Sequence, residues 1–174
     1  YHDGLDFLKE QGGPPRLILW LGSNVGNFQR DDAVHFLQRL HTTMRPDDRF
    51  LIGIDLRKDA AILESAYDDA AGVTAAFNKN LLTRINRELG ADFDLDAFSH
   101  EARWNQDAGR VEMHLVGEIA QSVHIAAIDL MVEFEGSESI HTENSYKYSP
   151  DEIQALATSS HFGMECQWFD EARR

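Results

Sequence analysis

The stretch Arg16-Leu-Ile-Leu-Trp-Leu21, followed directly by Gly22-Ser-Asn-Val-Gly-Asn27, decides the fold class of this chain. Its first six residues form a short apolar run after the turn-forming sequence Gly12-Gly-Pro-Pro15, which predicts a buried β-strand. Apolar residues then recur at helical spacing, so a helix is expected over about 30–41. A second apolar run over 50–55 predicts another buried strand. The order strand, helix, strand indicates an α/β fold with a parallel sheet.

Between about 59 and 146 the pattern changes to that of an α+β unit. Apolar residues at helical spacing predict a long helix that ends at Gly90, because glycine commonly closes a helix. Alternation with a period of two begins at about Arg110, after the turn Asp107-Ala-Gly109, and a further long strand is expected over 123–134. We therefore expect antiparallel strands inserted into the α/β sheet.

The end of the chain is expected to rejoin its beginning. Ser149 is suited to cap a helix whose first residue is Pro150. Residues 162–169 then resemble a strand that returns to the first sheet. We therefore predict two domains, one made of 1–58 together with 147–174 and the other made of 59–146.

Composition limits the partners and the compartment of the chain. The net charge of −14 argues against nucleic acid and against an anionic membrane surface. No apolar run approaches the roughly 20 residues that span a bilayer, and the first residues lack a signal-peptide pattern. A single cysteine, Cys166, leaves no pair for an internal disulfide or a thiolate zinc site. We therefore expect a cytoplasmic protein that binds neither membrane nor nucleic acid.

Polar residues near the strand ends allow two interpretations each. Gly22 lies where ligands bind in open α/β sheets, and Asn27 offers both a donor and an acceptor. The local pattern alone favours a tight turn in which Asn27 caps the next helix. Asp55 could bind a cofactor or cap a helix. Tyr67 could reach a ligand through its hydroxyl, although the pattern favours an aromatic anchor beside two solvated aspartates.

The stretch Thr142-Glu-Asn-Ser-Tyr-Lys147 also carries polar groups of interest. Glu143, Ser145 and Lys147 alternate, so they would share one face of a strand. A buried glutamate beside a hydroxyl could hold a cationic or N–H-bearing ligand. The alternative is the solvent face of an edge strand. In Glu112-Met-His114, Met113 is most simply a core residue.

Metal ligands are not apparent from spacing. The eight histidines show no paired ligand spacing. The stretch Asp92-Phe-Asp-Leu-Asp96 starts like a calcium loop but has Ala97 where that loop needs glycine and Arg103 where it needs glutamate. We expect no metal site, and we interpret Asp94 as a helix cap.

Several segments together resemble one family, the histidine-specific N-α-methyltransferases of ergothioneine biosynthesis. They are Leu21-Gly-Ser-Asn-Val-Gly-Asn-Phe28, Tyr67-Asp-Asp-Ala-Ala-Gly72 with its continuation to Asn78, Arg84-Ile-Asn-Arg-Glu-Leu89, Ala91-Asp-Phe-Asp94, Arg110-Val-Glu-Met-His-Leu115 and Thr142-Glu-Asn-Ser-Tyr-Lys147. The resemblance covers nearly the whole chain in the expected order, and the Tyr-Asp-Asp-Ala-Ala-Gly stretch is highly specific. It implies a partial Rossmann-like methyltransferase sheet with an inserted α+β substrate-binding domain. It also implies S-adenosylmethionine as the methyl donor and L-histidine as the substrate.

The resemblance implies a role for each of the residues near the strand ends. Gly22 would lie beside both the cofactor and the reacting amine. Asn27 and Tyr67 would hold the substrate carboxylate, and these three residues would form the catalytic set. Tyr1 matches an aromatic residue that packs near the adenine of the cofactor.

The resemblance also implies how the substrate side chain is recognised. Glu143 and Ser145 would hold the imidazole, and Met113 would line its pocket. The family's glutamate and methionine at these positions favour histidine over other amino acids, and this chain has both. Asn24 stands where relatives often have threonine or serine.

The implied reaction transfers methyl groups from a sulfonium to the α-amine of histidine, up to the trimethylated betaine. We expect the chain to be a piece of the enzyme, inactive alone, because the family's glycine-rich cofactor loop precedes the residue that Tyr1 matches. Two alternatives stay open. One is a methyltransferase for another small amine, such as a tryptophan derivative. The other is a non-catalytic module that binds an amino acid or a partner chain.

Overall fold

The computed structural model describes residues 2–10 and 12–171. The chain divides into two compact units, which are treated separately below. The first unit comprises Tyr1–Lys58 and Ser145–Arg174, and the second comprises Asp59–Asn144. Helices and strands occur in both units, so the predicted mixed α/β class is confirmed. The Rossmann-like arrangement and the roles of the two predicted domains stay predictions.

The first unit contains the predicted order of strand, helix and strand. Its elements are α1 (His2–Glu10), β1 (Leu17–Trp20), the 3-10 helix η1 (Asn24–Asn27), α2 (Arg30–Thr43), β2 (Arg49–Ile52) and α5 (Pro150–Ser159). Strands β1 and β2 pair in parallel, from Leu17 opposite Arg49 to Trp20 opposite Ile52. The parallel pairing expected from the first strand, helix and strand is therefore confirmed. Asp55 lies three residues after β2 rather than at the end of the strand.

Only one face of this two-stranded sheet is buried. Trp20 is 9% exposed and its ring lies 4.8 Å from the ring of Phe36 on α2, measured between centroids. On the other face, Leu17 and Leu19 are 64% and 56% exposed. The prediction that β1 is a buried strand is therefore wrong for one of its faces, because none of the described elements covers it.

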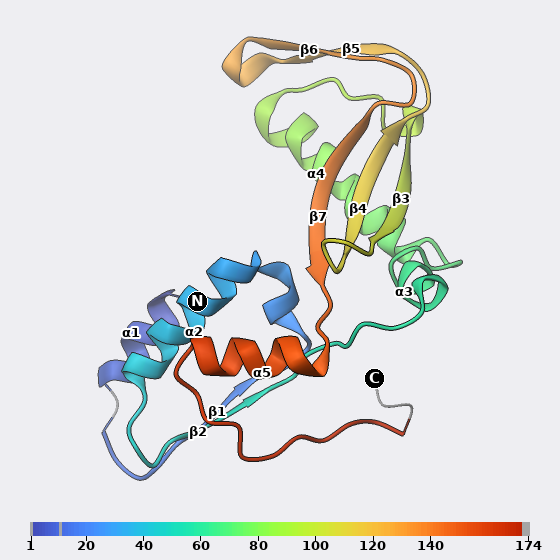
Figure 1. Cartoon of the computed structure of the whole chain (residues 1–174). Helices are drawn as coiled ribbons and strands as arrows, with labels where there is room; N and C mark the ends of the chain where they lie inside the picture. The colour runs from blue at the N-terminus through green and yellow to red at the C-terminus, as the bar shows by residue number, and fades with distance from the viewer. Residues whose placement is uncertain (1, 11, 172–174) are drawn as a thin grey trace. The chain divides into compact units, whose positions relative to one another are not determined.

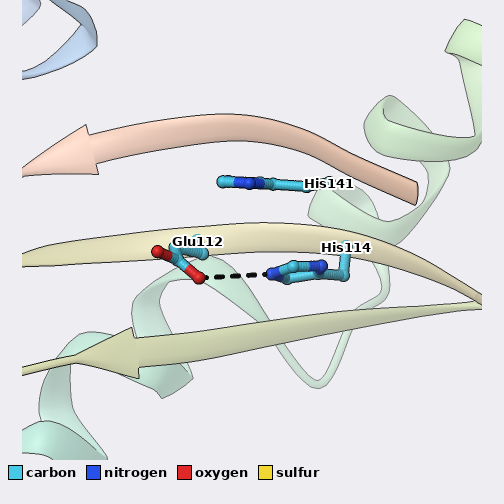
Figure 2. A group of neighbouring side chains, drawn as sticks. All are labelled: Glu112, His114 and His141. Carbon is cyan, nitrogen blue, oxygen red and sulfur yellow. Dashed lines mark ion pairs between the residues drawn. The ribbon is translucent and has the colours of Figure 1, made fainter. Parts of the chain in front are cut away.

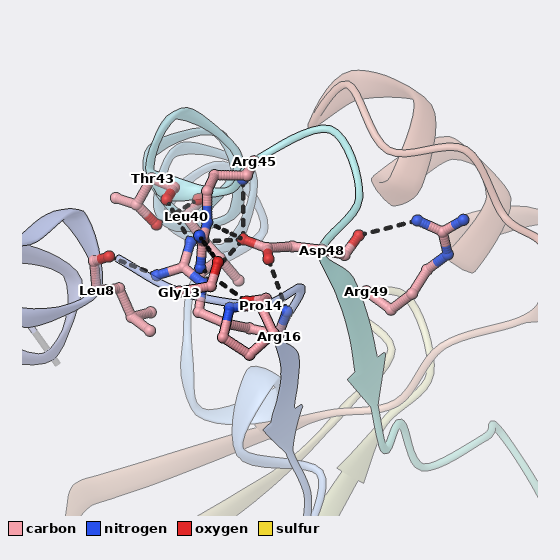
Figure 3. Close-up of polar contacts among 9 residues, drawn as sticks. All are labelled: Leu8, Gly13, Pro14, Arg16, Leu40, Thr43, Arg45, Asp48 and Arg49. Carbon is pink, nitrogen blue, oxygen red and sulfur yellow. Dashed lines mark hydrogen bonds and ion pairs between the residues drawn. The ribbon is translucent and has the colours of Figure 1, made fainter. Parts of the chain in front are cut away.

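The starts of both strands are tied together by Asp48, which is 5% exposed (Figure 3). Its carboxylate accepts hydrogen bonds from the backbone N–H and the Nε of Arg16, at 2.8 and 2.9 Å, and from the backbone N–H of Arg45 at 2.9 Å. The hydrogen bond from the Arg16 side chain is the main cause that holds the pKa of Asp48 well below its usual range. Arg16 also donates to the carbonyl of Thr43 at the end of α2. A buried, fully bonded carboxylate thus fixes the register at which β1 and β2 begin.

The second unit combines helices with an antiparallel sheet. Its elements are α3 (Ala60–Tyr67), α4 (Val73–Leu89), η2 (Leu95–Ala97), β3 (Phe98–Asn105), β4 (Arg110–Gly117), β5 (Gln121–Ile125), η3 (Ala126–Ile128), β6 (Leu130–Phe134) and β7 (Ser139–Tyr146). Strand β4 lies between β3 and β7, and β5 pairs with β6 in a separate two-stranded sheet. Figure 1 shows α4 along one face of the three-stranded sheet. The core between them contains Leu82, Phe98 and Leu115. The last two residues of β7 belong to the first unit.

Two predicted strands are wrong. Residues 123–134 form a hairpin rather than one long strand, because the chain turns through η3 and Asp129 adopts a left-handed conformation with φ 48°. Residues 162–169 form no strand, since no described strand pairs with them.

The local predictions about helix ends are confirmed. Gly90 closes α4 with φ 62°, and the Asp94 side chain caps η2 by accepting from the N–H of Asp96. Ser149 caps α5, Pro150 stands at its start, and Glu152 completes a capping box. Among the described helices, none has both the length and the apolar character needed to cross a membrane.

Candidate functional site

The turn after β1 is closed by its own side chains. Gly22 and Ser23 both adopt left-handed conformations, with φ 76° and 55°, so the chain reverses sharply after the strand. The hydroxyl of Ser23 accepts from the backbone N–H of Asp55 at 2.9 Å, and Asn24 Nδ2 donates to the carbonyl of Leu21 at 2.6 Å. Gly22 remains exposed.

Gly26 holds this turn against the end of β7. A Cβ at Gly26 would lie 2.7 Å from the carbonyl oxygen of Tyr146 and 3.5 Å from Ser145 Oγ, so only glycine fits without a shift. Asn27 is exposed, and the residue at the cap position of α2 is Gln29. The interpretation of Asn27 as a helix cap is therefore wrong. The first unit thus brings together Gly26 and Ser145, with Asn27 following directly in the chain.

The ammonium group of a buried lysine contacts the Ser145 side chain. Lys147 is 1% exposed, and its ammonium lies 3.0 Å from Ser145 Oγ and 3.0 Å from Asp55 Oδ2. Lys58 also donates to Asp55, at 2.6 Å. Burial raises the pKa of Asp55, but the hydrogen bonds from Lys58 and Lys147 outweigh it, so this pKa lies below its ordinary value. Asp55 caps no helix, because the cap of α3 is Asp59.

In the second unit, Tyr67 stands at the end of α3 and is half-buried. Its carbonyl oxygen lies 2.7 Å from His100 Nε2, and the other ring nitrogen of His100 lies 2.9 Å from Asn78 Nδ2. The carboxylate of Asp69 accepts from the backbone N–H of Thr74 at 2.8 Å. This hydrogen bond from Thr74 is the largest of the effects that lower the pKa of Asp69 to about 2. Asp69 therefore orders the chain after Tyr67 and is not merely solvated.

Met113 and Glu143 lie on neighbouring strands of the same sheet. Met113 is buried on β4, and its carbonyl oxygen accepts from the Thr142 hydroxyl on β7 at 2.9 Å. Glu143 follows Thr142 and is half-buried.

The six described site residues thus fall into two sets. Gly22, Asn27 and Ser145 belong to the first unit, and Tyr67, Met113 and Glu143 belong to the second. Tyr1, which was expected near the adenine, lies outside the described residues. The roles of all seven residues stay predictions.

Sequence reasoning missed Gly26 and Lys147 as parts of this site. The signal for Gly26 was weak, because its need for glycine comes from a backbone far along the chain. For Lys147 the sequence pattern indicates only that it shares a strand face with Glu143 and Ser145.

A family model described as histidine-specific methyltransferase, SAM-dependent, matches residues 1–174, so the chain belongs to this family.

Individual relatives give the same picture. A histidine N-alpha-methyltransferase of Mycolicibacterium smegmatis is 46% identical over 171 residues, which cover 96% of this chain and 53% of that protein. The enzyme of the same name from Mycobacterium tuberculosis is 47% identical over 160 residues, covering 92% of this chain and 50% of that protein. Ergothioneine biosynthesis protein 1 of Neurospora crassa is 31% identical over 176 residues, which cover 97% of this chain and 19% of that protein. The chain spans about half the length of the two bacterial relatives.

Among solved structures, the CcbJ methyltransferase from Streptomyces caelestis matches with a TM-score of 0.39 and 10% identity. The match covers 88% of this chain and 49% of that one. A likeness this distant supports no argument about the fold.

Proposed function

We propose that the chain is part of an enzyme that transfers methyl groups from S-adenosylmethionine to the α-amine of L-histidine. The observation that carries this proposal is the identity of 46% and 47% to two proteins named histidine N-alpha-methyltransferase, over more than nine-tenths of this chain. The glycine turn and the Ser145 environment described above support it.

The first part of the proposal concerns the reacting end of the substrate. S-adenosylmethionine supplies a methyl group on a positively charged sulfur. Gly22 fits a close approach of donor and amine, because its backbone is exposed and an added Cβ would meet only Asn24, at 3.5 Å. The amide of Asn27 and the hydroxyl of Tyr67 would hold the substrate carboxylate and so aim the amine. Positioning of this kind can supply effective molarities of about 10⁵–10⁸ M.

The methyl-transfer step balances without a group from the protein forming a bond. The nitrogen lone pair forms the new N–C bond while the S–C bond breaks and its electron pair stays on sulfur. Each transfer that starts from an N–H amine then releases a proton from nitrogen. The residues of this chain therefore bind and orient the substrate rather than form covalent intermediates.

The second part concerns the imidazole. The Lys147 ammonium donates to Ser145 Oγ at 3.0 Å, and the Ser145 hydroxyl would donate to the unprotonated nitrogen of the imidazole ring. Glu143 would accept from the other ring nitrogen, which carries a proton. Together the two residues would select a neutral imidazole with one donor and one acceptor.

The test uses the protein made from its complete reading frame. It is incubated with S-adenosylmethionine and a mixture of all the amino acids, and products are identified by mass spectrometry. Trimethylhistidine as the main product, strongly reduced in Glu143→Gln and unchanged in the exposed-residue control Glu133→Gln, is the expected result. A different methylated amino acid would overturn the substrate. No product together with no binding of S-adenosylmethionine would favour a non-catalytic module.

A further inference from the structure

Two histidines and a glutamate gather on the sheet of the second unit. Glu112 and His114 are two residues apart on β4, so they point to the same face, and His141 lies beside them on β7 (Figure 2). One donor atom from each residue lies within 4.8 Å of those of the other two. The mechanism proposed above uses none of the three.

The Nε2 atom of His114 is buried without a hydrogen-bond partner, and the residue is 7% exposed. Nε2 faces Glu112 Oε2 at 3.5 Å, which is beyond a normal hydrogen bond. The other ring nitrogen lies 3.4 Å from the Ser139 hydroxyl. A buried imidazole nitrogen that faces a carboxylate without a hydrogen bond gains a partner when a metal cation replaces its proton and lies between the two groups.

Glu112 is oriented by groups behind it. Its Oε1 accepts from Asn105 Nδ2 at 3.0 Å and from Arg110 Nε at 2.8 Å. These bonds leave Oε2 to face His114, as outer hydrogen bonds commonly orient a metal-binding carboxylate.

The third residue, His141, has room to move. Its Nε2 lies 2.8 Å from Asn144 Oδ1. The His141 ring stacks on the His114 ring, with centroids 4.7 Å apart and an interplanar angle of 17°. Ring lone pairs lie in the ring plane, so two parallel rings cannot both point at one ion. His141 is exposed and can turn its ring without disturbing the core.

We propose that Glu112, His114 and His141 form a binding site for a divalent transition-metal ion of the zinc type, which closes when the His141 ring turns toward the other two. Zinc held tetrahedrally at about 2.0–2.2 Å places neighbouring donor atoms roughly 3.3 Å apart, close to the 3.5 Å between Glu112 and His114. Two imidazoles and one carboxylate suit ions of this class and leave a position for water. Arg110 offsets part of the Glu112 charge, so the site is weaker than an all-anionic one.

The site is tested by titrating the tag-free, chelator-stripped protein with Co²⁺ and following its visible absorption, with Zn²⁺ as competitor. One Co²⁺ per chain, displaced by Zn²⁺, is expected, and NMR should show the ring signals of His114 and His141 shifting together. His141→Ala and Glu112→Gln should each weaken binding at least tenfold. None of these measurements depends on methyl transfer, so their failure leaves the proposed function untouched.

His124→Ala is the matched control. His124 also faces a carboxylate at 3.5 Å, that of Asp129, and lies in the same unit outside the cluster. Binding should be unchanged in this variant. Co²⁺ binding that fails to saturate at one equivalent, or that survives in both His141→Ala and Glu112→Gln, would overturn the site. Equal loss in His124→Ala would do the same. His141 is exposed, so its variant tests the site without disturbing the core.

Discussion

Lys147, which is buried, and Asp55, which is half-buried, form an ion pair, with 3.0 Å between Nζ and Oδ2, at the point where β7 meets the chain after β2. Asp55 also donates its backbone N–H to the Ser23 hydroxyl, and Lys147 contacts Ser145. This ion pair therefore links the glycine turn to the strand that carries Ser145, the residue proposed to bind the imidazole of the substrate.

Replacing Lys147 with methionine should destabilise the first unit by about 1.5–3 kcal/mol, because Asp55 loses one of the two charged hydrogen bonds that it accepts from lysines. Lys58 stays beside Asp55, which keeps the loss near the lower end of the usual range. Urea unfolding followed by tryptophan fluorescence measures the change. Lys9→Met, at an exposed lysine 3.9 Å from Asp6, is the control and should change the free energy of unfolding by under about 0.5 kcal/mol. Equal stability of the two variants would contradict the role given to Lys147.

Gly26→Ala should lower the free energy of unfolding by roughly 1–3 kcal/mol. The new methyl group would lie 2.7 Å from the Tyr146 carbonyl oxygen, so the backbone must shift. The same measurement on Gly163→Ala serves as the comparison, because nothing lies within 4 Å of a Cβ there. If the two alanine variants unfold at the same urea concentration, the close approach is not a constraint on the turn.

Glu143→Gln and Ser145→Ala should affect the use of histidine differently. Loss of a hydrogen bond to a charged group costs about 1.5–3 kcal/mol, and loss of a neutral one about 0.5–1.5 kcal/mol. These values correspond to falls in kcat/KM of about 10–150-fold for Glu143→Gln and about 2–13-fold for Ser145→Ala. Steady-state kinetics of the complete protein with histidine gives both numbers. A larger loss in Ser145→Ala than in Glu143→Gln would reverse the proposed roles.

Asp69 should make α4 sensitive to acid. Its folded pKa of about 2 lies below the ordinary value of 3.8, so its contribution to stability is present above pH 3.8 and is lost as the pH falls toward about 2. Asp69→Asn should remove this contribution, so that stability declines less between pH 3.8 and about 2. Circular dichroism melts across this range measure it, with the exposed Asp68→Asn as the control. A decline of the same steepness in Asp69→Asn as in the unmodified chain would exclude Asp69 as its source.

Features set by local sequence could be predicted, and those set by distant contacts could not. Gly90, Asp94 and Ser149 end or begin helices through their own backbone freedom or side-chain oxygens, so their neighbours suffice to place them. The hairpin within 123–134 was missed because Asp129, rather than a glycine, adopts the left-handed conformation. Residues 162–169 have a strand-like composition, but a strand needs a partner that composition does not reveal.

The candidate site divides in the same way. The residues expected to hold histidine were reached through resemblance in short motifs, because spacing left each of them with a structural alternative. The sequence could not predict the cluster of Glu112, His114 and His141, because these residues meet across two strands that are distant in the chain. Sequence spacing can reveal metal-binding residues that lie along one helix or loop. It does not reveal that β4 and β7 pair in the sheet, which is what brings these residues together.

The exposed leucines of β1 should also affect how copies of this chain behave toward one another in solution. A net charge of −14 keeps the copies apart at low ionic strength, while Leu17 and Leu19 favour their adhesion. Dissolved salt shortens the reach of that repulsion to about 8 Å at 0.15 M and leaves the apolar attraction in place. Adding salt should therefore promote clustering of this acidic chain, and dilute buffer is the medium in which it stays dispersed.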